Sequence, residues 1–182
     1  PSYDNNMLAN KIESGYYSTL LNSSAYPLLN RPTSQVTTTG STFKPLSALI
    51  GLGEGIVNTD TKIKDLGIFE LIVPSPRCWK YPGNHGSINL SQAIMHSCNY
   101  YFYDVGFKLS TDYTGRYSDS LGISKIKRYA EMFGLTEKTG IEISEATPSV
   151  SNSDAVRTSI GYGHALAPVQ IARYITGIAN EG

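Results

Sequence analysis

The sequence predicts a single domain of the mixed α/β (α+β) class in which helices outnumber strands. Its 182 residues are enough for one domain with a core of its own. Several segments place apolar residues at the three-and-four spacing of a helix that faces a core, whereas one apolar segment alternates as a strand does. We therefore expect a mainly helical chain with few strands and no internal repeats.

The first predicted core helix spans residues 41–53. Residues 1–40 before it are broken by prolines and a Thr-rich run, and they contain one short helical candidate near residues 13–21. Within 41–53, apolar side chains recur at helical spacing, and Pro45 falls in the first turn, where the missing N–H has no partner to lose. Ser41 is thus expected at the mouth of this helix.

An irregular excursion is predicted over residues 57–88, because prolines and glycines surround its strand-like alternating piece at 67–73. Asn89 or Ser91 can cap a helix of about two turns that follows. Periodicity does not decide whether the helix breaks near residues 97–99. The later helices, marked by periodicity or by proline and glycine signals, are expected at 100–109, 124–133 and 168–179.

Charge and hydropathy exclude several classes of function. Lys and Arg number 15 and Asp and Glu also number 15, so the balanced charge gives no electrostatic basis for binding nucleic acid or an anionic membrane. No window approaches the roughly 18 to 20 continuous apolar residues of a membrane span. The start at Pro1 carries neither an initiator methionine nor a signal-like segment, so we expect a piece of a longer protein. The low charged fraction suits an uncharged polar surface outside the cytoplasm.

Ser41 and Lys44 form a Ser-x-x-Lys pair that predicts a nucleophile with its own base. Residues three apart on a helix share one face, so the hydroxyl and the amine are within reach of each other. The lysine pKa of about 10.4 must fall by about 3 units before the amine can act as a base near neutral pH. Burial and a helix N-terminus both lower it. The tetrapeptide alone also occurs by chance, with an ordinary solvated lysine.

The context of this pair resembles the nucleophile segment of class B penicillin-binding proteins, the extracytoplasmic transpeptidases of bacterial cell-wall synthesis. Further segments resemble that family in the family's order, and they cover nearly the whole chain: residues 1–4, 28–31, 40–45, 91–93, 97–103, 133–135 and 138–142. Members of the rod-elongation branch have segments similar to Cys78-Trp79-Lys80 and His85-Gly86. The septal and sporulation branches remain open.

The resemblance implies a role for each site residue. Ser41 is implied as the acylated nucleophile, Lys44 as its proton acceptor, and Ser97 with Asn99 as the second motif, Ser-x-Asn. The hydroxyl of Ser97 can relay a proton to the leaving amine, and the Asn99 amide can bind the substrate. Acyl transfer of this kind needs no cofactor.

The same resemblance implies a penicillin-binding transpeptidase or serine β-lactamase-like fold, with helices around an antiparallel sheet. We expect residues 1–182 to be one partial transpeptidase domain, truncated at both ends, that holds mainly the helical portion and an incomplete sheet. The family's third motif, Lys-Thr-Gly or Lys-Ser-Gly, follows the helix expected at 168–179, and the chain stops at Gly182. The Lys138-Thr139-Gly140 triplet is similar to a different, structural segment. This chain alone is therefore expected to acylate poorly.

The implied substrate is the D-alanyl-D-alanine end of a peptidoglycan stem peptide, and β-lactam antibiotics are implied as acylating inhibitors. The resemblance also implies a parent anchored at the extracytoplasmic face of the bacterial membrane, with a glycan-polymerising partner and a role in cell shape. Two alternatives remain: a β-lactam sensor domain and a catalytically silent scaffold for wall assembly. A hydrolytic β-lactamase fits the similar segments less well.

Four potential metal ligands lie within the second motif or upstream of it. Cys78, His85, Cys98 and Asp65 offer two thiols, an imidazole and a carboxylate, which is a plausible tetrahedral zinc set. Some elongation-type members of the family are similar in carrying zinc at matching places. Such a zinc would be structural, because four protein ligands leave no open position.

Other interpretations of these residues remain open. Asp60 can replace Asp65, and His96 can replace His85. A disulfide between the two cysteines suits an extracytoplasmic location, and two unrelated buried thiols need no special explanation. Among the aromatic residues, Trp79, Tyr81 and the run at 100–103 could line a substrate groove, although aromatics at helical spacing more often fill cores.

Overall fold

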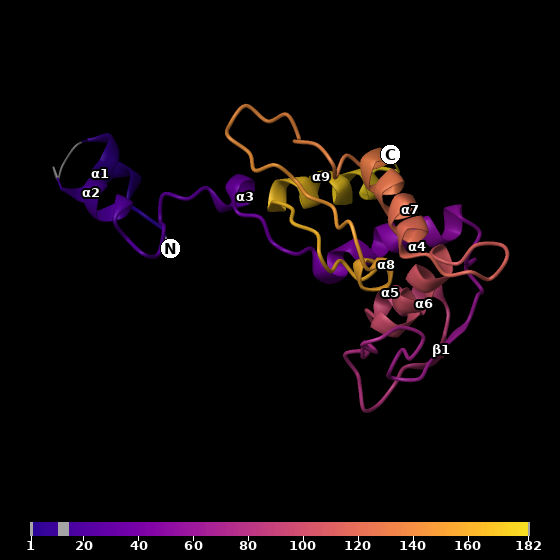
Figure 1. The fold of residues 1–182 in the computed structure, drawn as a ribbon. Coiled ribbons are helices and arrows are strands. Elements are labelled where there is room, and N and C mark those ends of the chain that lie inside the picture. Colours follow the sequence, from indigo (N-terminus) through magenta and orange to yellow (C-terminus); the bar gives the residue numbers. More distant parts are fainter. Residues whose placement is uncertain (1, 11–14, 182) are drawn as a thin grey trace.

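The computed structural model describes residues 2–10 and 15–181, and it places a helical body at the end of an extended N-terminal arm (Figure 1). The arm carries α1 (Asn5–Ala9) and α2 (Tyr16–Leu21), which lie apart from the body. The short helix expected near 13–21 is confirmed from residue 16 onward, and residues 13 and 14 lie outside the described part.

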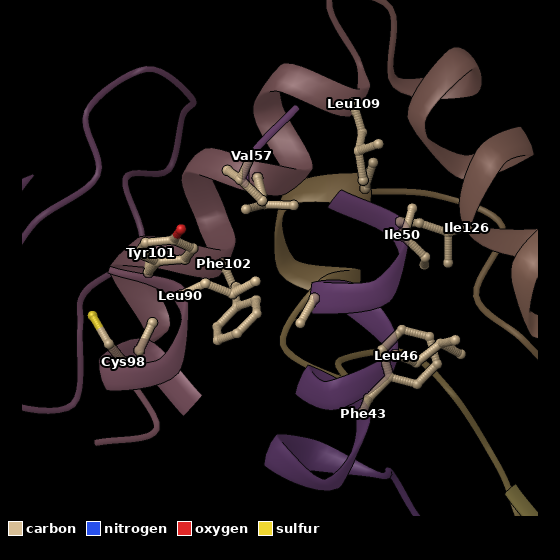
Figure 2. Packing of buried hydrophobic residues seen from close by; sticks show 14 of the residues in the cluster. Phe43, Leu46, Ile50, Val57, Leu90, Cys98, Tyr101, Phe102, Leu109 and Ile126 are labelled. Carbon is tan, nitrogen blue, oxygen red and sulfur yellow. The ribbon is translucent and has the colours of Figure 1, made fainter. Parts of the chain in front are cut away.

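Helices α4 (Lys44–Gly53), α6 (Asn99–Leu109) and α7 (Asp119–Met132) form the centre of the body. Each contributes side chains to one apolar core, in which Phe102 of α6 lies beside α4 (Figure 2). Burying one such side chain stabilises the fold by about 1.5–3 kcal/mol. The core therefore fixes α4, which carries Lys44, against α6, which carries Asn99. The fully buried members shown there include Leu46, Ile50, Tyr101, Leu109 and Ile126.

The expected helix at 41–53 begins as a 3-10 turn, η1 (Gly40–Phe43), and continues as α4. Pro45 lies in the first turn of α4, as the sequence predicts. The side chain of Asn89 accepts a hydrogen bond from Gln92 at the start of α5 (Leu90–Met95), so Asn89 and not Ser91 is the cap. The helix predicted at 168–179 is α9 (Pro168–Ala179).

The sheet is small: β1 (Ile63–Asp65) pairs antiparallel with β2 (Gly86–Ile88). Ile63 and Asp65 point inward and Lys64 outward, as the two-residue period of a strand requires. The irregular excursion expected over residues 57–88 is confirmed: its alternating piece at 67–73 is a loop that makes one isolated bridge, between Ile68 and Arg77. Leu71 and Val73 remain exposed there, and the prolines that follow cannot donate to a ladder.

Helix α7 begins five residues before the predicted start at 124. The Asp119 carboxylate accepts hydrogen bonds from the backbone N–H groups of Asp154 and Ala155, each at 2.7 Å, where α8 (Ala155–Thr158) begins. This contact is tertiary, so the local sequence pattern did not reveal it. The remaining helix, α3 (Arg31–Ser34), contacts α9. Among the described residues, every helix is too short or too polar to cross a bilayer.

Candidate active site

The turn that carries Ser41 is held from two sides. The hydroxyl of Tyr174 on α9 donates to the carbonyl oxygen of Thr42 at 2.7 Å. On the other side, Gly161 lies so close that a Cβ atom there would be 2.0 Å from the carbonyl oxygen of Gly40. Gly161 also has a φ of +88°, which favours glycine. These contacts leave the Ser41 side chain exposed on a fixed backbone.

Ser97 lies at the break between α5 and α6, which the helical periodicity left undecided. The N–H of Ser97 bonds the carbonyl of Ile94 at 3.0 Å, and the N–H of Cys98 bonds that of Ala93 at 2.9 Å. This pair of bonds is a Schellman motif, in which the residue at the Ser97 position adopts a left-handed conformation and is usually glycine. Ser97 has a φ of +50°. The strained serine thus ends α5 and directs the chain into α6.

The two motifs meet through hydrogen bonds. The Ser97 hydroxyl donates to the Ser41 hydroxyl at 2.9 Å. The Lys44 ammonium donates to the Ser97 hydroxyl at 2.9 Å, to the Ser97 carbonyl at 2.7 Å and to Oδ1 of Asn99 at 2.6 Å. These three acceptors match the three donors of an ammonium group. A continuous chain of hydrogen bonds therefore joins Ser41 to Lys44 through the Ser97 hydroxyl.

Lys44 is 2% exposed, and burial lowers its pKa to about 8. The cause is desolvation, since removing water penalises the charged form. Its three hydrogen-bond acceptors are neutral oxygens, which compensate the charge only in part. A substantial fraction of the amine is then neutral in mildly alkaline solution and able to accept a proton.

Cys98 points away from Ser97 and Asn99 and joins a cluster behind the motif. The ligand atoms of Asp65, Cys78, His85 and Cys98 all lie within 4.8 Å of one another. The two sulfur atoms are 3.9 Å apart and both cysteines are free, so no disulfide joins them. Side chains along residues 97–99 therefore point in alternate directions. Ser97 and Asn99 face Lys44, and the Cys98 thiol faces the cluster.

The ligand atoms of the cluster lie in direct contact with one another. Nδ1 of His85 is 3.6 Å from the Cys78 sulfur and 2.7 Å from Oδ2 of Asp65, and the Cys98 sulfur is 3.6 Å from the same Oδ2. A hydrogen bond from the Cys98 thiol lowers the pKa of Cys78, which favours the thiolate that metals bind. Nε2 of His85 is buried without a hydrogen-bond partner among the described residues.

The alternative ligands lie outside this group. The His96 ring stacks on the His85 ring, with centroids 5.7 Å apart, and its side chain is not among the four ligands. Asp60 is exposed and is also outside the group. The set of one carboxylate, one imidazole and two thiols is therefore the one that the fold brings together.

The Lys138-Thr139-Gly140 triplet has a structural contact. Glu145 is nearly buried and accepts hydrogen bonds from the Thr139 N–H at 2.9 Å and from its hydroxyl at 2.9 Å. Nε2 of Gln170 on α9 donates to the same carboxylate at 2.7 Å. Thr139 thereby ties its loop to α9, which agrees with a structural role for the triplet.

The expectation that Trp79 and Tyr81 fill the core was wrong. Both rings are exposed, whereas Tyr101, Phe102 and Tyr103 are buried as expected. The indole N–H of Trp79 donates to the carbonyl of Ser97 at 3.0 Å. Sequence patterns carry no signal for this contact, since the acceptor is a backbone atom 18 residues away.

Comparison with known proteins agrees with the site geometry. The family model described as the penicillin-binding protein transpeptidase domain matches residues 1–182. The peptidoglycan D,D-transpeptidase MrdA of Haemophilus influenzae is 33% identical over 201 residues, which cover 100% of this chain and 29% of that protein. The chain thus spans less than a third of that relative.

Solved structures give the same result. The structure of Pseudomonas aeruginosa PBP2 in complex with WCK 5153 has a TM-score of 0.84 and 28% identity, covering 100% of this chain and 42% of that one. The imipenem acyl-enzyme complex of penicillin-binding protein A from Mycobacterium tuberculosis has a TM-score of 0.81 and 25% identity, with the same two coverages. This chain belongs to the transpeptidase domain family of class B penicillin-binding proteins.

Proposed function

We propose that this chain carries the acyl-serine site of a peptidoglycan D,D-transpeptidase that cross-links stem peptides. The observation that carries the proposal is the hydrogen-bond chain from Ser41 through Ser97 to the buried Lys44. A nucleophile, a relay and a base of lowered pKa are the parts that acyl transfer through a serine ester requires. Residues 1–182 are, on this proposal, part of one transpeptidase domain.

The chemistry follows from this order of groups. The Ser41 oxygen attacks the carbonyl carbon of the penultimate D-alanine, and its proton passes through the Ser97 hydroxyl to neutral Lys44. The tetrahedral intermediate then collapses: the peptide C–N bond breaks, and the terminal D-alanine leaves as an amine that takes the proton back from Lys44 through Ser97. The amine of a second stem peptide then attacks the ester carbon: a C–N bond forms, the C–O bond to Ser41 breaks, and the proton of the amine passes through Lys44 and Ser97 to the Ser41 oxygen. With a β-lactam only the first half of the reaction takes place: Ser41 attacks the ring carbonyl, the ring C–N bond breaks, and the opened antibiotic remains as an ester on Ser41.

The two remaining groups bind and stabilise. Asn99 Oδ1 accepts from Lys44, so its amide N–H₂ is directed to another partner, which we propose is the substrate amide. The N–H of Ser41 in the first turn of η1 is a candidate donor to the oxyanion.

We further propose that the four-ligand cluster binds a structural zinc ion. Zinc held by two thiolates at about 2.3 Å in a tetrahedron places the sulfur atoms about 3.8 Å apart, and the observed separation is 3.9 Å. The Asp65–His85 pair at 2.7 Å is a hydrogen bond, which is shorter than the roughly 3.4 Å edge of a zinc tetrahedron. That pair would separate as the metal binds. The ion would hold Cys98 and thereby the residues on either side of it.

Zinc content tests this part of the proposal. Elemental analysis of the full-length protein, purified without added metal, should find about one zinc per chain, and Cys98→Ser should lower the content. The exposed residue Asp60 offers a control, because Asp60→Asn should leave the content unchanged. Protein that contains no zinc in any form would contradict the assignment.

The setting of the enzyme is also a proposal. The similarity to the peptidoglycan D,D-transpeptidase MrdA supports the elongation branch. The role in cell shape and the place at the extracytoplasmic face of the membrane follow from the family resemblance. A membrane anchor and a glycan-polymerising partner would belong to this setting. A β-lactam sensor or a silent scaffold are the rival functions, and the joined Ser41–Ser97–Lys44 chain argues against a silent one.

Mass spectrometry tests the function. The full-length protein is incubated with excess penicillin, and the adduct is located by peptide mapping, with Ser41→Ala as the control. We expect one adduct, confined to Ser41 and absent from the variant. An adduct elsewhere, or none, would refute the assignment of the nucleophile. Release of D-alanine from a stem peptide then separates an enzyme from a sensor, which acylates without turnover of the peptide.

A further inference from the structure

Trp79 combines an exposed ring with a fully engaged N–H group. Its side chain is 61% exposed, yet Nε1 donates to the carbonyl of Ser97 at 3.0 Å and to that of His96 at 3.2 Å. The ring meets the His85 ring edge to face, with centroids 5.2 Å apart, and this contact orients it. At so exposed a position the indole N–H could bond to water and needs no acceptor from the protein. The contact therefore matters for the two carbonyl groups that it binds.

The acceptors are the last two carbonyls of the α5 terminus. The Ser97 carbonyl also accepts from Lys44 at 2.7 Å, so two donors occupy the two lone pairs of one oxygen. The peptide that carries it follows a residue with a φ of +50°, a conformation that costs a serine about 1–2 kcal/mol. A peptide under such strain needs fixed partners to hold its direction. Of its two partners, Lys44 belongs to the Ser-x-x-Lys pair, and Trp79 belongs to neither motif.

We propose that Trp79 is a positioning residue for acyl transfer, whose indole N–H fixes the Ser97 peptide so that the carbonyl and the hydroxyl of Ser97 both face Lys44. It acts through Ser97: it exchanges no proton and forms no bond with the acyl group. If the peptide turned, the Ser97 hydroxyl would leave the line between Ser41 and Lys44 and the relay would be interrupted. This inference rests on the proposed function.

Two variants of Trp79 in the full-length protein separate the N–H from the ring. Trp79→Phe keeps an aromatic face and removes the donor, whereas Trp79→Ala removes both. Tyr81→Phe is the matched control, because Tyr81 is an exposed aromatic residue of the same loop. The measurement is penicillin acylation, resolved into the rate at saturation and the concentration that gives half of it.

We expect both Trp79 variants to lower the saturated rate about tenfold, as the misplacement of a catalytic group does, with little change in the half-saturating concentration. Tyr81→Phe should match the wild type. The melting temperature and zinc content of Trp79→Phe should also match, so that a merely structural loss is distinguished from lost positioning. Wild-type rates in Trp79→Phe would overturn the inference, whether or not Trp79→Ala is slow, because the ring alone would then suffice.

The contact can also be tested in the wild type, independently of acylation. Hydrogen exchange of the Trp79 indole N–H, followed by NMR, should be slow despite the exposed ring, and fast exchange would overturn the inference. If penicillin leaves no adduct on the wild type, the proposed function fails by itself. The exchange result then still decides whether Trp79 holds the Ser97 carbonyl.

Discussion

Lys44 shows how burial changes the protonation of a single lysine in the candidate site. A lysine surrounded by carboxylates would keep its proton, whereas this one has three neutral oxygen acceptors and almost no contact with water. The hydrogen bonds offset part of the cost of burying the charge, and burial still lowers the pKa to about 8. Near pH 8, the ammonium and neutral amine forms of Lys44 are therefore present in similar amounts.

This balance predicts the pH dependence of acylation. Below pH 8 the ammonium form prevails, so the acylation rate should rise with pH and level off above the pKa of about 8. From pH 7 to the plateau the rise should be about tenfold, because one unit below the pKa about a tenth of the amine is neutral. Stopped-flow acylation with a chromogenic β-lactam measures it. Lys44→Arg keeps a cation that cannot act as a base, and it should be inactive throughout; a flat wild-type profile would contradict the role of Lys44.

The α5–α6 junction is the structural element that brings the Ser97 hydroxyl to Ser41. The Schellman motif ends α5 at a residue where glycine is usual, and the chain has Ser97 instead. Its hydroxyl is the group that bonds Ser41 and Lys44. The strained backbone position therefore carries the side chain that links Ser41 to Lys44.

Two substitutions at Ser97 separate strain from chemistry. Ser97→Gly and Ser97→Ala both remove the hydroxyl, so each should lower the acylation rate by about a hundredfold. Only Ser97→Ala keeps a side chain at positive φ, so Ser97→Gly should be more stable than Ser97→Ala by about 1 kcal/mol. Urea unfolding of the two variants measures this difference. Equal stability would show that the backbone at residue 97 is not left-handed in solution.

Sequence patterns predicted the elements whose signals are local. Pro168 marks the start of α9, and Asn89 forms a capping box with Gln92 three residues on, so both helix starts could be read from neighbours in the chain. The start of α7 at Asp119 was missed because its partner is the N-terminus of α8. The family resemblance pointed to the four candidate side chains that the fold brings together, whereas the contact of Trp79 with a backbone carbonyl has no sequence signature.

At the scale of the whole molecule, late segments of the chain hold the early segment that carries Ser41. Thr37 pairs with Leu166 in an isolated bridge, and Tyr174 bonds the carbonyl of Thr42. Between these two contacts, Gly161 lies against Gly40. Contacts across more than 120 residues thus set the position of Ser41, and the acylation rate should depend on the packing of residues that lie far from it in sequence.

Gly161→Ala tests this dependence, and Gly115→Ala is its matched control. Both glycines have positive φ, +88° and +84°, so alanine meets similar backbone strain at each. A Cβ at Gly115 has open space, whereas one at Gly161 would be 2.0 Å from the carbonyl oxygen of Gly40. Gly161→Ala should therefore destabilise the protein by about 1–3 kcal/mol more than Gly115→Ala, because the turn at Gly40 must move.

That movement displaces Ser41 from the Ser97 hydroxyl, so Gly161→Ala should also be acylated more slowly at a temperature where both variants are folded. Thermal unfolding and penicillin acylation measure the two effects, and equal acylation rates in both variants would mean that the position of Ser41 does not depend on this contact.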